Sequence, residues 1–301
     1  MSDPAPDKGA LMRMATYAAV GTAAVLIVIK LAAWMATGSM ALLSTLIDSL
    51  LDAGASLVNL IAVRHALQPA DRDHRFGHGK AEPLAGMAQS AFVAGSGLFL
   101  IIEAAGRLAD PQPITRPLVG IYVMAASIFL TLALVLFQKY VVAKTKSMAV
   151  GADSLHYTGD VLINGSVIVS LLLAQQFDVS FVDPLFAIGI ALFLMWNALG
   201  IARSSMDHLM DREFPEAERE KIKQIARTHP GVRNAHDLRT RSSGAQSFIQ
   251  LHLEMDGRLP LVEAHAIADA VEAKLRQAFS DAEVIIHQDP TGIKEEHPEF
   301  K

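Results

Sequence analysis

The sequence predicts a membrane α-helical domain of six transmembrane helices, followed by a soluble α+β domain. Of its 301 residues, 51% are hydrophobic and the mean hydropathy is +0.32, well above what soluble domains show. The apolar residues are concentrated before residue 211, whereas the remainder has the mixed charge of an ordinary soluble chain. We therefore divide the chain into four parts, namely an N-terminal tail (1–10), a transmembrane domain (11–210), a soluble domain (211–290) and a flexible tail (291–301).

Six segments are apolar over the length of about 20 residues that a bilayer-spanning helix needs. Polar, Gly-rich or Pro-rich stretches separate them, for example at 69–79 and 144–147. The predicted spans are 12–36, 39–66, 80–108, 115–142, 151–175 and 182–208.

The placement of Lys and Arg predicts the orientation of these spans. Within the predicted membrane domain, basic residues gather at the loops after the second and fourth spans, whereas the other side has only Arg107 and Arg116, so we place both loops in the cytoplasm. An even number of spans then puts both termini in the cytoplasm. The first nine residues lack the pattern of a cleaved signal peptide.

After residue 211 the pattern alternates between helix and strand signals. We predict an αββαβ domain of about 80 residues, a size that is marginal for a stable monomer and therefore favours a dimer. The expected elements are a helix at 216–228, strands at 235–241 and 246–255, a helix at 261–279 and a strand at 282–287.

Composition excludes several classes of function. The chain has no cysteine, which rules out disulfides and thiolate metal sites, and its net charge of −5 argues against a nucleic-acid partner. It lacks the zinc-hydrolase, nucleotide-binding and serine-hydrolase motifs. Transport against a gradient would therefore need an ion gradient in place of ATP.

Two pairs of polar residues stand out inside the predicted spans. Asp48 and Asp52 lie in the second, and His156 and Asp160 in the fifth. Residues four apart share one face of a helix, so two facing helices would present three carboxylates and an imidazole to a divalent metal. The alternative is hydrogen bonding between helices, but ionisable groups within a bilayer are expensive and mark ion or proton paths. We interpret the four residues as a transport site for divalent metal ions.

Two further clusters lie outside the spans. Asp71, His74 and His78 could close on a cation, or could simply belong to a solvated, charged loop. In the soluble domain a second set could converge at one end of a small sheet, or could be surface histidines in part. That set is His236, His252, His265, His287 and Asp289.

The ligand chemistry itself predicts coupling to protons. A metal-bound His156 must be deprotonated, so metal and proton compete for one nitrogen and the expected activity is metal/proton antiport. A membrane-anchored metal sensor is the main alternative, and it would need only the soluble cluster. An intramembrane metal hydrolase is a weaker alternative, because four protein ligands leave no open coordination position.

At these residues the chain resembles the cation diffusion facilitator family, specifically its bacterial zinc and ferrous-iron efflux branch. The resemblance extends from the first span to about Pro290. It is carried by residues 44–52 (STLIDSLLD), 73–83 (DHRFGHGKAEP), 152–156 (ADSLH) and 285–290 (IIHQDP).

The resemblance implies a homodimer in the bacterial inner membrane that exports Zn²⁺ in exchange for protons by alternating access. Each protomer would have six spans and a cytoplasmic metallochaperone-like domain, with membrane lipid, metal ions and protons as its other partners. The soluble set would form a dinuclear site at the dimer interface. Lys80 and Asp211 would form an interlocking salt bridge, and Leu155 would belong to a hydrophobic gate.

One departure concerns the substrate. Many zinc-selective relatives have His at the first transport position, where this chain has Asp48. The resulting ligand set is harder, so Fe²⁺, Cd²⁺ and Mn²⁺ are also candidate substrates, in addition to Zn²⁺.

Overall fold

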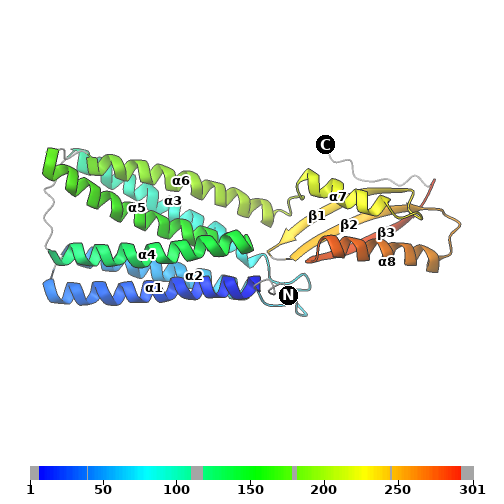
Figure 1. The fold of residues 1–301 in the computed structure, drawn as a ribbon, viewed down its shortest axis with the longest axis horizontal. Coiled ribbons are helices and arrows are strands. Elements are labelled where there is room, and N and C mark those ends of the chain that lie inside the picture. The colour runs from blue at the N-terminus through cyan, green and yellow to red at the C-terminus, as the bar shows by residue number, and fades with distance from the viewer. Residues whose placement is uncertain (1–6, 39, 110–117, 178–181, 245, 293–301) are drawn as a thin grey trace, which may run out of the picture. The chain divides into compact units, whose positions relative to one another are not determined.

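The computed structural model describes residues 7–38, 40–109, 118–177, 182–244 and 246–292. The chain forms two compact units, residues 1–206 and 207–301, which we describe separately. In the first unit, six long helices lie side by side (Figure 1). They are α1 (Lys8–Thr37), α2 (Met40–Ala66), α3 (Ala81–Ala109), α4 (Leu118–Thr145), α5 (Met148–Phe177) and α6 (Val182–Leu209).

The six predicted spans are confirmed as helices. Five of the described helices are also long and apolar enough, by themselves, to cross a membrane. The first half of α5 carries Asp153, His156 and Asp160.

Two of these helices begin earlier than predicted, because polar residues cap them outside the apolar segment. The Asp7 carboxylate accepts a hydrogen bond from the Gly9 amide and starts α1 at Lys8. The Ser147 hydroxyl accepts one from the Val150 amide and starts α5 at Met148. Residues 110–117, between α3 and α4, and 178–181, between α5 and α6, lie outside the described part of the chain.

Small residues let α6 pack closely on its neighbours. A Cβ atom at Gly97 of α3 would lie 2.8 Å from the Met195 side chain, and one at Gly159 of α5 would lie 2.8 Å from Leu194. Such close approach is how helices associate in lipid, where no hydrophobic effect drives them together. Leu155, the predicted gate residue, packs in the same region against Val93, Leu194 and Ala198.

The second unit has the predicted αββαβ order. Its elements are α7 (Glu216–Arg227), β1 (Asn234–Ser243), β2 (Gln246–Met255), α8 (Leu261–Ala278) and β3 (Ala282–Pro290). The sheet order is β1-β2-β3, with β1 antiparallel and β3 parallel to β2. The strands β1 and β3 run two and three residues beyond their predicted ends, and the added residues of β3 include Asp289.

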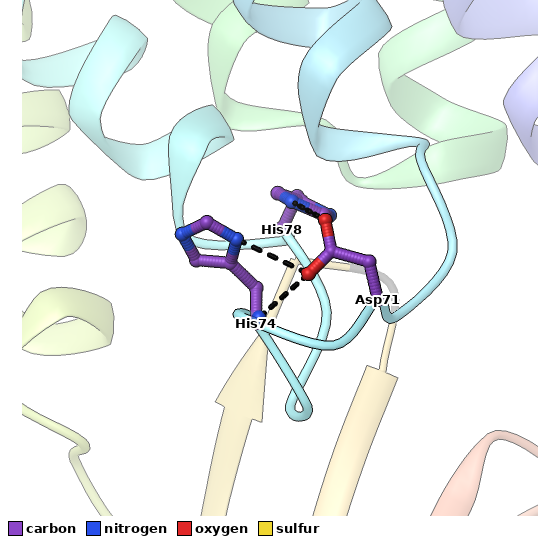
Figure 2. Close-up of side chains that lie close together, drawn as sticks. All are labelled: Asp71, His74 and His78. Atoms are coloured by element: carbon purple, nitrogen blue, oxygen red, sulfur yellow. Dashed lines mark hydrogen bonds and ion pairs between the residues drawn. The ribbon is translucent and has the colours of Figure 1, made fainter.

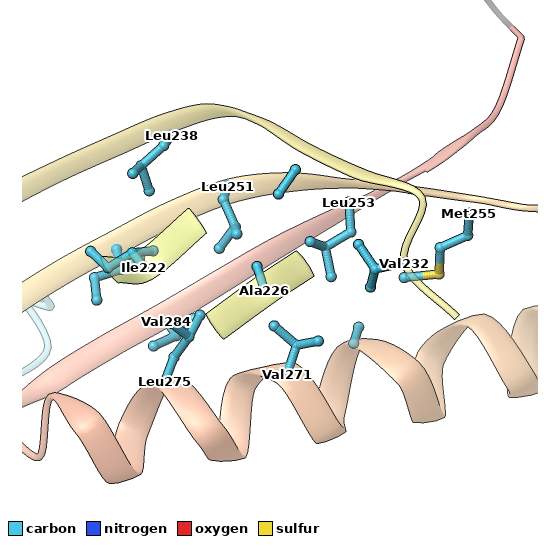
Figure 3. Packing of buried hydrophobic residues seen from close by; sticks show 13 residues of the cluster. Ile222, Ala226, Val232, Leu238, Leu251, Leu253, Met255, Val271, Leu275 and Val284 are labelled. Carbon is cyan, nitrogen blue, oxygen red and sulfur yellow. The ribbon is translucent and has the colours of Figure 1, made fainter. Parts of the chain in front are cut away.

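One hydrophobic core lies between the sheet and the two helices (Figure 3). Ile249, Leu251 and Leu253 are fully buried against Leu275 of α8 and Ile222 of α7. Because side chains alternate along a strand, Gln250 and His252, which lie between these three residues, point to the other face of the sheet. That face carries the soluble histidine cluster.

Candidate metal centres

The structure brings together three of the four predicted transport residues. Nε2 of His156 lies 3.0 Å from Oδ1 of Asp52, and ligand atoms of Asp52, His156 and Asp160 all lie within 4.8 Å of one another. The His156 imidazole is buried and its ring edge contacts Phe92. Asp48, one turn before Asp52 on α2, is exposed and lies outside this group.

Polar neighbours of the group hold the helices around it. The Lys30 ammonium donates to the Ser49 hydroxyl at 2.6 Å and to the Thr45 carbonyl at 3.1 Å, which ties α1 to α2 next to Asp48. The Asn59 amide donates to the Ala149 carbonyl and so joins α2 to α5. Asn164 bonds the Asp160 carbonyl within α5.

Asp153 joins three helices, which was not predicted from the sequence. It is fully buried, and its two oxygens accept hydrogen bonds from Gln138 on α4 (2.7 Å) and Ser56 on α2 (3.3 Å). Ser56 is also 2.8 Å from the Tyr157 hydroxyl. The network joins α2, α4 and α5 next to the transport group. Its signal in the sequence was a third ionisable residue on α5, three positions before His156.

The predicted loop cluster also forms (Figure 2). One Asp71 oxygen lies 3.3 Å from Nδ1 of His74, and the other lies 3.3 Å from Nε2 of His78. Backbone N–H groups of His74 and Asp73 also donate to this carboxylate, and the His74 bond in particular holds the pKa of Asp71 below its usual value. Gly77, at φ +75°, supplies the left-handed turn that brings His78 back to Asp71.

In the soluble domain, strand register aligns three histidines. His236 pairs with His252 across β1 and β2, and His252 pairs with His287 across β2 and β3. Asp289, buried, lies on the same face and contacts all three rings. Its Oδ2 is 2.9 Å from His252 Nδ1 and 3.3 Å from His236 Nε2, and its Oδ1 is 3.1 Å from His287 Nε2. A carboxylate that presents both oxygens to different imidazoles suits two metal ions that share a ligand.

His265 lies elsewhere within the described protomer. It is exposed on α8, 3.4 Å from Asp269, and outside the cluster formed by His236, His252 and Asp289. Its place in a dinuclear site therefore stays a prediction.

Two carboxylates near the histidine row were missed. Glu254 lies 3.5 Å from His236 Nδ1, and Asp237 lies 3.6 Å from His252 Nε2. Asp237 has φ +43° at an irregularity of β1 between His236 and Arg239. Alternation along an ideal strand would have placed Asp237 on the opposite face from His236, so no periodic pattern could have found it.

The predicted salt bridge joins residues of different units. Lys80 belongs to residues 1–206 and Asp211 to 207–301, so the pair stays a prediction. Within its own unit, Asp211 lies 3.4 Å from Arg241.

These features define a multi-pass membrane protein with clusters of metal-type ligands. Its long apolar helices place ionisable residues close together, and its small second domain carries a row of histidines. Comparison with known families agrees. Residues 16–210 match the model of the cation efflux transmembrane domain, and residues 214–291 match that of the cation efflux protein cytoplasmic domain. The chain belongs to the cation diffusion facilitator family of metal cation efflux transporters.

Curated relatives match over nearly the whole length. The chain is 50% identical over 287 residues to the cation-efflux pump FieF of Cronobacter sakazakii, which covers 95% of each chain. It is 47% identical over 298 residues to FieF of Yersinia enterocolitica, covering 98% of this chain and 99% of the relative. Among solved structures, the Zn form of the candidate zinc transporter CzrB is 34% identical over 29% of this chain and 99% of that chain, with a TM-score of 0.27.

Proposed function

We propose that this chain exports divalent metal ions, Zn²⁺ first among them, in exchange for protons. The observation that carries the proposal is the group of Asp52, His156 and Asp160 on α2 and α5. Two carboxylates and an imidazole form a hard, mixed N/O donor set, which suits zinc and also accepts Fe²⁺, Cd²⁺ or Mn²⁺. Asp48 would complete the set from the next turn of α2.

Exchange follows from the contact between His156 and Asp52. The imidazole and the carboxylate share a hydrogen bond in the structure. A metal ion replaces that hydrogen and binds both groups in their deprotonated forms, so loading the site releases protons and protonation expels the metal. With access alternating between the two sides, a proton gradient would then drive export.

The other clusters have supporting roles in this proposal. The protein would act as a homodimer in the inner membrane with both termini in the cytoplasm. The histidine row on Asp289 would bind two structural ions at the dimer interface, joined there by His265. The pair of Lys80 and Asp211 would link the two domains, and Leu155 would close the transport path when the site faces the other side. The loop cluster would be a further metal site.

The deciding experiment is metal flux into proteoliposomes under an imposed pH gradient. The variant His156→Ala should abolish gradient-dependent Zn²⁺ flux while the protein still inserts and dimerises. Asn164→Ala is the matched control, because Asn164 lies one turn after Asp160 on α5 and its amide donates to a carbonyl of its own helix.

Retention of saturable flux in His156→Ala would refute the site. Tight zinc binding without flux under either direction of the gradient would favour a membrane-anchored metal sensor. The histidine row in the soluble domain is the feature that such a sensor would use. Fe²⁺, Cd²⁺ and Mn²⁺ in the same assay would rank the substrates.

A further inference from the structure

A third imidazole lies beside the loop cluster. His65, in the last turn of α2, has its ring centroid 4.6 Å from that of His78, with the two planes at 66°. The ring of His74 lies 4.7 Å from the same ring. His78 therefore contacts an imidazole from the loop and another from the end of α2.

One ring nitrogen of the buried His78 has no hydrogen-bond partner among the described residues. His78 is 8% exposed, and its Nε2 faces Asp71. Its Nδ1 is also buried and has no hydrogen-bond partner among the described residues. Buried polar atoms are almost always paired, so an unpaired nitrogen on a ring that contacts two other imidazoles indicates a ligand site.

The spacing of the rings fits a shared metal ion. Two imidazoles on one tetrahedral zinc, with Zn–N bonds of about 2.1 Å, place their ring centroids about 5 Å apart. The separations of 4.6 and 4.7 Å are close to this value. Asp71, His74 and His78 supply only three ligands, whereas a closed zinc site has four. His65 is exposed, so its ring can rotate toward the ion without displacing packed neighbours.

We propose that His65 is the fourth protein ligand of the loop site, which then holds one Zn²⁺ or similar ion with Asp71, His74 and His78. This inference rests on the loop site of the proposed function. A site closed by four protein ligands retains its ion, in contrast to a transport site, which must release it. The ion in the loop site would thus be a permanently bound structural ion that links the end of α2 to the loop before α3.

The test uses the full-length protein in detergent with Asp52→Ala and Asp289→Ala present, so that the transport and soluble clusters are disabled. Zn²⁺ affinity is measured by competition with a chromophoric chelator, and coordination by the visible bands of bound Co²⁺. In this background His65→Ala should weaken zinc binding roughly 10–100-fold, the range known for disturbed metal sites. It should also reduce the intense bands of tetrahedral Co²⁺.

Two further variants separate ligation from packing. His65→Asp supplies a different ligand atom and should recover part of the affinity, whereas Arg64→Ala, its neighbour on α2, should match the background protein.

Unchanged affinity and Co²⁺ bands in His65→Ala, with binding lost in Asp71→Ala, would overturn the role of His65 and leave the loop site standing. If Asp71→Ala and His74→Ala also bind as the background does, the loop site itself is wrong and the inference fails with it. The flux assay on His156→Ala decides the transport proposal separately.

Discussion

Nε2 of His156 on α5 lies 3.0 Å from Oδ1 of Asp52 on α2, although 104 positions separate the two residues in the chain. The contact forms inside two long helices of the membrane domain, and Asp160 lies within ligand distance of both residues. An imidazole and a carboxylate in contact can bind either a proton or a metal ion. The predictions below begin from this pair.

Asp52→Asn should reduce metal flux at least about tenfold, because the substitution preserves the shape of the side chain and removes the charge that binds the cation. The measurement is initial Zn²⁺ uptake into proteoliposomes at equal protein content. Circular dichroism and gel filtration control for folding. Flux at the wild-type rate in Asp52→Asn would show that the ion takes another path.

Asp153→Ala should destabilise the membrane domain without removing a metal ligand. The change leaves the buried Gln138 amide without its acceptor, at a cost of about 1–3 kcal/mol, whereas Ser56 keeps the Tyr157 hydroxyl as a partner. Thermal unfolding in detergent measures the effect. Thr158→Ala is the control, because its hydroxyl bonds only the Ser154 carbonyl of its own helix in the geometry described. Equal melting temperatures for the two variants would contradict the structural role of the network.

Asp289→Ala should lower the metal content of the soluble domain more than His265→Ala does. Asp289 contacts all three histidines of the row, so its loss removes the shared acceptor, whereas His265 lies outside that cluster. Metal content is measured on the full-length protein after gel filtration, with Asp52→Ala present to silence the transport site. A larger loss in His265→Ala would mean that a ligand set completed between two protomers dominates.

Asp256→Asn should lower stability at neutral pH and have a smaller effect in acid. Hydrogen bonds from Arg258, with further attraction from Arg233, lower the pKa of Asp256 to about 2. The folded form therefore gains stability above the unfolded pKa of about 3.9, and loses it as the pH falls from about 4 toward 2. The difference in melting temperature between wild type and variant should be constant from pH 7 to 5 and should shrink by pH 3. A constant difference down to pH 3 would exclude the ion pairs as its source.

Much of the fold is readable from local pattern. Apolar length placed all six helices of the membrane domain, and alternation along Gln246–Met255 placed β2 at its observed bounds. The helix ends at Lys8 and Met148 were not predicted, because hydropathy ends where the apolar residues end while capping by Asp7 and Ser147 extends the helix further.

The composition of the metal-ligand clusters could be predicted only in part. Spacing alone paired Asp48 with Asp52 and His156 with Asp160, but it could not say that α2 and α5 face each other, or that Asp48 would lie outside the group. Asp153 and His65 escaped notice because their partners, Gln138, Ser56 and His78, come from other helices or from a loop.

The sequence by itself determined the membrane class, the order of elements and the residue types able to hold a divalent ion. These depend on hydrophobic length, on periodicity and on ligand chemistry, all of which are local. The tertiary structure alone decided which ligands meet, such as His236, His252 and His287 in one row on Asp289. Strand register and helix facing arise from packing between segments distant in the chain, and no local pattern contains that information.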